Sequence, residues 1–138
     1  MTQYAQPDIE DLTVSYLRTV AGVTSIVAVD DIATKLRSSW TAATPALRVR
    51  RLGGIATSDS NHLVRFRLQI DAFAEDEATA YSIAAAAELA LRTMHEATHP
   101  GAVVTKYVSD LGITNTPDPD SDASRYLFGA AIYAHGIA

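Results

Sequence analysis

The sequence contains no cysteine, which excludes disulfide bonds, thiolate metal ligands and cysteine nucleophiles together. It has no apolar run near the roughly 20 residues that cross a bilayer, so we expect no membrane span. Its N-terminus lacks the basic-then-apolar order of a secretory signal. The residues that are present, 48% hydrophobic and 20% charged, are typical of a globular domain, and a length of 138 residues predicts a single domain over 1–138.

Charge is unevenly distributed along the chain. The formal net charge is −5, which disfavours bulk attraction to nucleic acid. The segment 48–67 nevertheless holds five of the eleven basic residues and one carboxylate, Asp59, whereas the segment 110–122 is acidic and meets no basic residue before Arg125. Such segregation favours docking against copies of the chain or against complementary neighbours, and a solvated surface with local excesses is the alternative.

Two helices are indicated by hydrophobic periodicity. The first is expected over 7–20, with Pro7 at its start, acidic residues in its first turn and Gly22 ending it. The second is expected over 75–96, with three acidic residues at its start, an alanine-rich centre and Pro100–Gly101 after it.

The segment between the first helix and the first clear strand is less regular. Residues 25–29 are compatible with a short strand, and Asp30 with the cap of a short helix that ends at Leu36. Trp40 follows in an expected loop over 38–45. A tryptophan in a loop usually covers the edge of a core or makes a subunit contact.

Four segments alternate between apolar and polar residues, as half-buried strands do: 46–52, 63–73, 102–110 and 126–135. In the second of them, the apolar set begins at Val64 and ends at Ala72, and the polar set is Arg65, Arg67, Gln69 and Asp71. The first two strands suggest an antiparallel hairpin with a ten-residue tip over 53–62. The fold class expected is α+β: a mainly antiparallel four-stranded sheet packed against two long helices, with a long hairpin loop.

One catalytic pattern is present. His95-Glu96-Ala97-Thr98-His99 matches the H-E-x-x-H spacing of zinc proteases, which requires both histidines on one rigid helical face. Pro100 follows at once, so His99 is expected at or beyond the end of the helix, where a histidine ordinarily opposes the helix dipole. We therefore expect no catalytic residues, no bound metal and no cofactor, and keep a small zinc hydrolase as an alternative.

Two other charged sets favour plain surface roles. The run Asp118–Asp122 lacks the glycine and the terminal glutamate of a calcium loop, and a solvated loop is expected instead. The arginines at 48, 50, 65 and 67 have no aromatic residues interleaved on their face of the strands, which favours contact with protein over contact with nucleic acid.

The order of parts along nearly the whole chain resembles the tail terminator proteins of long-tailed bacteriophages, particularly those that infect actinobacteria. The resemblance rests on the acidic helix start at 7–12, the strand PALRVRRLGG at 45–54, and LQIDAFA at 68–74 leading into the alanine-rich helix. Val103-Val104-Thr105, the loop Pro117-Asp118-Pro119-Asp120 and the closing strand from Arg125 complete it.

This resemblance implies a structural virion protein that forms a homohexameric ring. Such a ring caps the tail tube, ends tube polymerisation and joins the tail to the head-closure or connector protein, while genomic DNA passes through the lumen without sequence-specific binding. The expected location is the head–tail junction of the virion, with the host cytoplasm during assembly. A head-closure or connector adaptor protein of the same junction is the alternative.

Under this resemblance, residue sets receive expected roles. The sheet face with Arg48, Arg50, Arg65 and Arg67, the strand edges and Trp40 are candidates for contacts between subunits. The hairpin tip, with Gly53, Gly54, Asp59 and Asn61, is a candidate for contact with the tube or the connector. Asp118, Asp120 and Asp122 are candidates for the border of the channel, where negative charge repels DNA.

Overall fold

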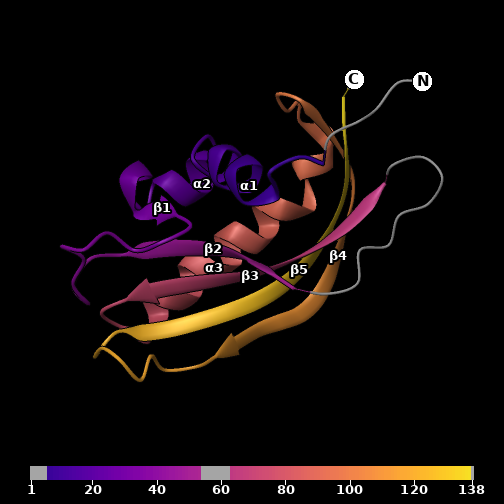
Figure 1. Cartoon of the computed structure of the whole chain (residues 1–138). Helices are drawn as coiled ribbons and strands as arrows, with labels where there is room; N and C mark the ends of the chain where they lie inside the picture. The colour runs from indigo at the N-terminus through magenta and orange to yellow at the C-terminus, as the bar shows by residue number, and fades with distance from the viewer. Residues whose placement is uncertain (1–5, 54–62, 138) are drawn as a thin grey trace.

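The computed structural model describes residues 6–53 and 63–137. Figure 1 shows one curved sheet with the helices gathered along one of its faces. The sheet has the strand order β1-β2-β3-β5-β4. Its strands are β1 (Ile32–Ala33), β2 (Ala46–Leu52), β3 (Val64–Ala74), β4 (Ala102–Asn115) and β5 (Ser124–Gly136).

The sheet confirms the α+β class and corrects the number of strands. It has five strands and not four, because the two-residue β1 pairs in parallel with β2 through Ile32 and Leu47. All other pairings are antiparallel. The two final strands also extend beyond the predicted bounds: β4 continues to Asn115 and β5 begins at Ser124, so the loop between them shortens to residues 116–123.

The first helical region differs from its expected form. Helix α1 (Ile9–Leu17) begins after Asp8, whose carboxylate accepts a hydrogen bond from the backbone N–H of Asp11. It ends before Val20, and Gly22 lies within a separate short helix, α2 (Ala21–Thr24). The prediction of a strand over 25–29 was wrong, and the helix expected from Asp30 is only the 3-10 turn η1 (Val29–Asp31), which leads directly into β1.

Helix α3 (Glu77–Arg92) is the longest helix among the described residues. The carboxylate of Asp76 caps it by accepting from the backbone N–H of Thr79 at 2.8 Å. The helix ends four residues earlier than expected and is followed by the 3-10 turn η2 (Met94–Glu96). Small alanines fill much of its buried side, which lets it lie close to β3 and β5.

One hydrophobic core lies between the helices and the inner face of the sheet, the face that the helices cover. The inner residues of β3, from Val64 to Ala72, are at most 3% exposed, as the alternation predicted. On the opposite, outer face a small second cluster joins Ala46, Phe73 and Ala123 beneath the Trp40 loop. Among the residues that the structure describes, no helix is both long and apolar enough to cross a membrane.

Candidate functional site

The outer face of β2 and β3 brings the four predicted arginines together. Arg48 and Arg50 alternate with inward residues on β2, and Arg65 and Arg67 do the same on β3, so all four point away from the helices. The register pairs Arg48 with Asp71 and Arg50 with Gln69 across the two strands. The sequence alternation therefore predicted the face on which these residues lie.

Asp71 is the residue whose role the sequence reading missed. It was expected among the polar residues of the outer face, but its side chain is fully buried. Both Nε and Nη2 of Arg48 donate to its Oδ2, at 3.1 and 3.0 Å, and Nη2 of Arg50 lies 3.3 Å from the same oxygen. Gln69 donates to the other oxygen at 3.0 Å. A buried carboxylate requires such partners. The signal available in the sequence was that Asp71 is the one acidic residue within the two strands of an arginine-rich hairpin.

A second carboxylate repeats this arrangement further along the sheet. Nε and Nη2 of Arg67 donate to Oδ2 of Asp110, at 3.1 and 3.0 Å, and Nη2 of Arg65 lies 3.7 Å from Oδ1. Asp110 comes from β4, so the contact spans the neighbouring β5. We call the four arginines with Asp71 and Asp110 the arginine face; it consists of two Arg–Asp–Arg groups.

The arginines of this face differ in their exposure and in the number of hydrogen bonds that they donate to the two aspartates. Arg48 is 22% exposed and Arg67 39%, and each donates twice to one oxygen. Arg50 is 42% exposed, and its buried Nε has no hydrogen-bond partner among the described residues. The four guanidinium groups therefore have N–H groups that donate no hydrogen bond to Asp71 or Asp110.

Trp40 covers one end of the arginine face from within the same chain. Its ring meets Phe73 edge to face with centroids 5.4 Å apart, and its Nε1 donates to the carbonyl of Thr44 at 2.9 Å. The guanidinium of Arg48 lies over the same Phe73 ring, 5.2 Å from its centroid. Trp40 therefore anchors its loop on the outer side of the sheet.

A groove of about 420 Å³ separates the loop that carries Trp40 from the acidic loop, residues 116–123 between β4 and β5. Trp40, Arg48 and Arg50 line one part of it, and Asp118 and Asp120 another. The tertiary structure thus brings two of the residue sets singled out in the sequence to one place. The groove is the boundary at which the positive sheet face meets negative charge.

Asp118 is held within its own loop. Its side chain accepts from the backbone N–H of Asp120 at 3.3 Å and from the hydroxyl of Ser121 at 2.6 Å. Partial burial raises the pKa of this carboxyl, but these hydrogen bonds, with the nearby Arg125 and Arg48, outweigh that cost and hold the pKa below its ordinary value. The loop therefore stays negatively charged at neutral pH.

A second acidic segment lies at the same end of the sheet. Residues 75–77 follow β3 directly, and the register places Ala74, the last residue of β3, opposite Ser124, the first of β5. Nδ2 of Asn115, the last residue of β4, donates to Glu77, the first residue of α3, at 3.4 Å, which links this segment to the strand that leads into the acidic loop. We call residues 75–77 and 118–122 the acidic end; its carboxylates belong to Glu75, Asp76, Glu77, Asp118, Asp120 and Asp122.

The hairpin tip falls mostly outside the described residues. Gly53 is exposed at the end of β2. Gly54, Asp59 and Asn61 lie in the part of the tip that the structure does not describe, and their expected contact with a partner stays a prediction.

The histidine pattern does not form the geometry of a zinc protease. Helix α3 ends at Arg92, His95 is in the turn η2, and His99 lies beyond that turn, so the two histidines do not share a helical face. His95 is exposed, whereas His99 is only 6% exposed. Within residues 6–53 and 63–137, no group of three histidine, aspartate or glutamate side chains is placed to hold a metal.

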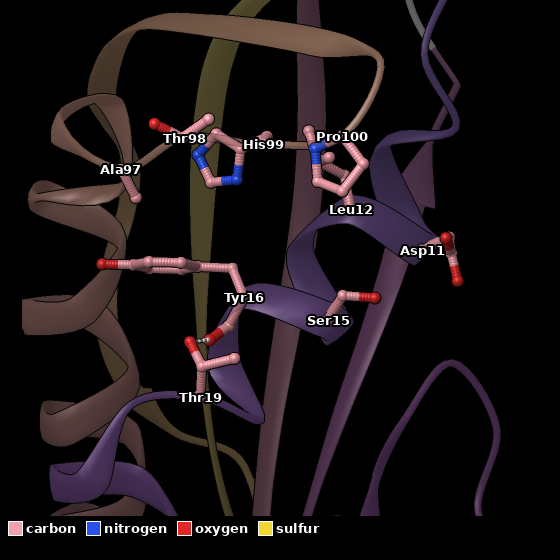
Figure 2. Close-up of a pocket in the computed structure, with 9 residues that line it drawn as sticks. All are labelled: Asp11, Leu12, Ser15, Tyr16, Thr19, Ala97, Thr98, His99 and Pro100. Atoms are coloured by element: carbon pink, nitrogen blue, oxygen red, sulfur yellow. Dashed lines mark hydrogen bonds between the residues drawn. The ribbon is translucent and has the colours of Figure 1, made fainter.

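His99 instead has a packing role. Its Nε2 is 2.7 Å from the carbonyl oxygen of Met94, and its ring meets Tyr16 of α1 edge to face with centroids 5.6 Å apart. Figure 2 shows both residues beside a groove between α1 and residues 97–100, with Leu12 and Pro100 among those that line it. The volume of this groove is about 320 Å³. In this segment, which matched a catalytic pattern, His99 packs the chain after α3 against α1.

Comparisons with known proteins bear on the fold. No family model and no curated protein matches the sequence. A chain in the solved structure of the virion of a native gene transfer agent particle is similar to this chain, with a TM-score of 0.75 and 14% sequence identity. The match covers 93% of this chain and 95% of that chain. At this identity the likeness establishes a shared fold, which extends over nearly the full length of both chains.

Proposed function

We propose that this chain is a structural subunit of a phage-like virion, and more specifically a tail terminator. In this role, copies form a homohexameric ring that caps the tail tube, ends its polymerisation and joins it to the head-closure or connector protein. Genomic DNA passes through the ring without sequence-specific binding. The ring acts at the head–tail junction of the virion after assembly in the host cytoplasm, and it catalyses no reaction.

The observation that carries the proposal is the fold shared with a chain of a virion particle over nearly all of both molecules. The order of parts in the sequence supports the terminator role independently, because that resemblance rests on the residues alone. The outer face of the sheet adds a physical argument. It carries paired arginines, which interfaces favour, in place of a second layer of helices.

The proposal is tested by deleting the gene from the genome that encodes the particle and measuring tails by electron microscopy. Loss of a terminator should give tubes of uncontrolled length without heads, and the wild-type gene supplied in trans should restore normal length. Tails of normal length that stay separate from heads would assign the chain to the head-closure or connector alternative. Complete particles with normal tails would contradict both roles.

A matched variant separates structural from catalytic action. His95→Ala removes the exposed histidine of the H-E-x-x-H match without touching the buried contact of His99. In the same complementation experiment it should restore tails as well as the wild type. A failure of well-folded His95→Ala to complement would reopen the hydrolase alternative.

A further inference from the structure

The arginine face carries more positive charge than it neutralises. Its four arginines contact two aspartates, which leaves a net charge of +2 on the face of an acidic protein. Lys106 adds to it from β4, where its Nζ lies 5.7 Å from the centroid of the Tyr133 ring. Guanidinium groups have five N–H donors each, and this face uses only some of them internally.

Apolar side chains lie beside these arginines on the same face. Val108 is 36% exposed and Leu111 is 50% exposed, both on β4. Ala131 of β5 pairs with Arg67 on one side and with Val108 on the other, so the charged and apolar rows are neighbours. Arginine next to exposed apolar surface is the composition of a protein interface.

The acidic end supplies charge of the opposite sign on the same chain. Glu75, Asp120 and Asp122 are exposed there. Asp76 and Asp118 also serve the helix cap and the turn, so their positions are fixed. The acidic end lies where strands end, whereas the arginine face points perpendicular to the sheet. The two surfaces adjoin at the groove that Arg48, Arg50, Asp118 and Asp120 line. Away from that groove, one chain presents positive charge on its sheet face and negative charge beyond its strand ends.

Pairing of exposed strand edges is a poor way for copies to associate. β4 lies at the edge of the sheet, and its ladder with β5 has register shifts between Val104 and Lys106, between Ser109 and Leu111, and between Leu111 and Thr114. Bulges and lysines on an edge strand discourage further strand addition. The β4 edge is therefore not the surface that we expect copies to share.

From these observations, and resting on the ring function proposed above, we infer that the arginine face of one copy binds the acidic end of the next. A contact between two different surfaces of identical chains is head-to-tail and repeats. Because the two surfaces point in different directions, each copy is rotated relative to the previous one, as closure of a ring requires. This inference places Asp120 and Asp122 in the contact between subunits. It therefore differs from the sequence-based expectation, which placed them at the border of the channel.

Two charge-inverted variants test the contact. The face-inverted variant carries Arg65→Glu, Arg67→Glu and Asp110→Arg, which changes the net charge of this Arg–Asp–Arg group from +1 to −1, lowers that of the whole arginine face from +2 to 0, and keeps the internal pairing. The end-inverted variant carries Glu75→Lys, Asp120→Lys and Asp122→Lys, which inverts three exposed charges and removes the net negative charge of the acidic end. It spares the carboxylates that cap α3 and close the turn. For each variant alone, sedimentation equilibrium at low salt should give an association constant at least about tenfold lower than that of the wild type.

An equimolar mixture of the two inverted variants is the decisive measurement. In the mixture, the unchanged arginine face of the end-inverted variant meets the unchanged acidic end of the face-inverted variant, so mixing should restore association and give a heterodimer in native mass spectrometry. Arg92→Glu, which reverses an exposed cation at the far end of α3, is the matched control and should associate as the wild type does. If circular dichroism shows that the face-inverted variant is unfolded, Arg65→Gln with Arg67→Gln replaces it in the single-variant comparison.

Four outcomes would overturn the inference. The end-inverted variant associates like the wild type, as a channel-facing acidic end would allow. The mixture stays as dissociated as its components. The wild type remains monomeric up to about 1 mM, beyond any useful affinity. Finally, inversion of the arginine face abolishes binding of a duplex DNA probe while self-association is unchanged. Each of these is read on purified protein, so it is distinct from a failure of the tail-length experiment.

Discussion

The two faces of one sheet use the same strands for different purposes. On the inner face, residues such as Ile70 are completely buried beneath the helices. On the outer face the next residue of the same strand, Asp71, is also buried, but it is surrounded by guanidinium groups instead of carbon. The comparison teaches that burial on the inner face creates the fold, whereas burial on the outer face organises charges that remain directed outward.

The largest difference between the faces should appear at Ile70. Ile70→Asp places a carboxylate without partners in the apolar core, and we expect a loss of about 4 kcal/mol or more, enough to unfold the domain. Gln69→Ala, one residue away on the outer face, should cost only about 1 kcal/mol through one lost hydrogen bond. Urea denaturation followed by circular dichroism compares them, and equal losses would refute the division into two faces.

The two Arg–Asp–Arg groups should also differ in how much they stabilise the fold, and the group with the more deeply buried aspartate should contribute more. Asp71→Asn leaves Arg48 and Arg50 without a counter-charge at a buried site and should cost about 3 kcal/mol. Asp110→Asn affects a group that is 21% exposed and should cost less than about 1 kcal/mol. Thermal melting of both variants measures this order. If Asp110→Asn lowered the melting temperature more than Asp71→Asn, the fold would depend more on the group around Asp110 than on the buried group around Asp71.

A smaller effect is expected at Gly129 of β5, beside the irregular part of β4 around Leu111. A Cβ added at Gly129 would lie 3.1 Å from Cβ and 3.2 Å from the backbone N of Leu111, closer than ordinary contact. Gly129→Ala should therefore destabilise the domain by about 1–2 kcal/mol. Gly112→Ala, with nothing within 4 Å of the added carbon, should change stability by less than about 0.5 kcal/mol. Chemical denaturation of the pair tests whether this close packing exists.

The last predicted effect concerns Tyr107, on the inner side of β4, and it appears only at alkaline pH. Burial, with the hydrogen bond from its hydroxyl to Glu88 at 2.9 Å, raises the pKa of Tyr107 from 10.0 to about 12. The folded state holds this proton more tightly than the unfolded state does. The associated stability is complete below pH 10 and is lost as the pH rises toward about 12.

Tyr107→Phe should consequently show a shallower loss of stability over that alkaline range than the wild type. Comparison of phenolate absorbance in the two folded proteins measures the titration of this residue directly. Ionisation of Tyr107 near pH 10 in the folded protein would contradict the contact with Glu88.

Local patterns predicted many elements of the fold and few of its contacts. The alternation in β3 and the charged start of α3 were sufficient to predict those elements and their buried sides, because side-chain direction in strands and helices is periodic. Element ends were less accurate: α3 stops at Arg92, and Ile32 pairs with β2 instead of continuing a helix. Such ends depend on partners distant in the sequence.

The candidate site shows the same division. The sequence alone determined which arginines share a face, because residues two apart on a strand point the same way. Only the tertiary structure decided that Asp71 is buried between Arg48 and Arg50, that Asp110 reaches Arg67 across β5, and that residues 75–77 lie beside the acidic loop. The physical reason is that periodicity acts over a few residues, whereas the pairing of charges depends on strand order and register, which the whole chain fixes together.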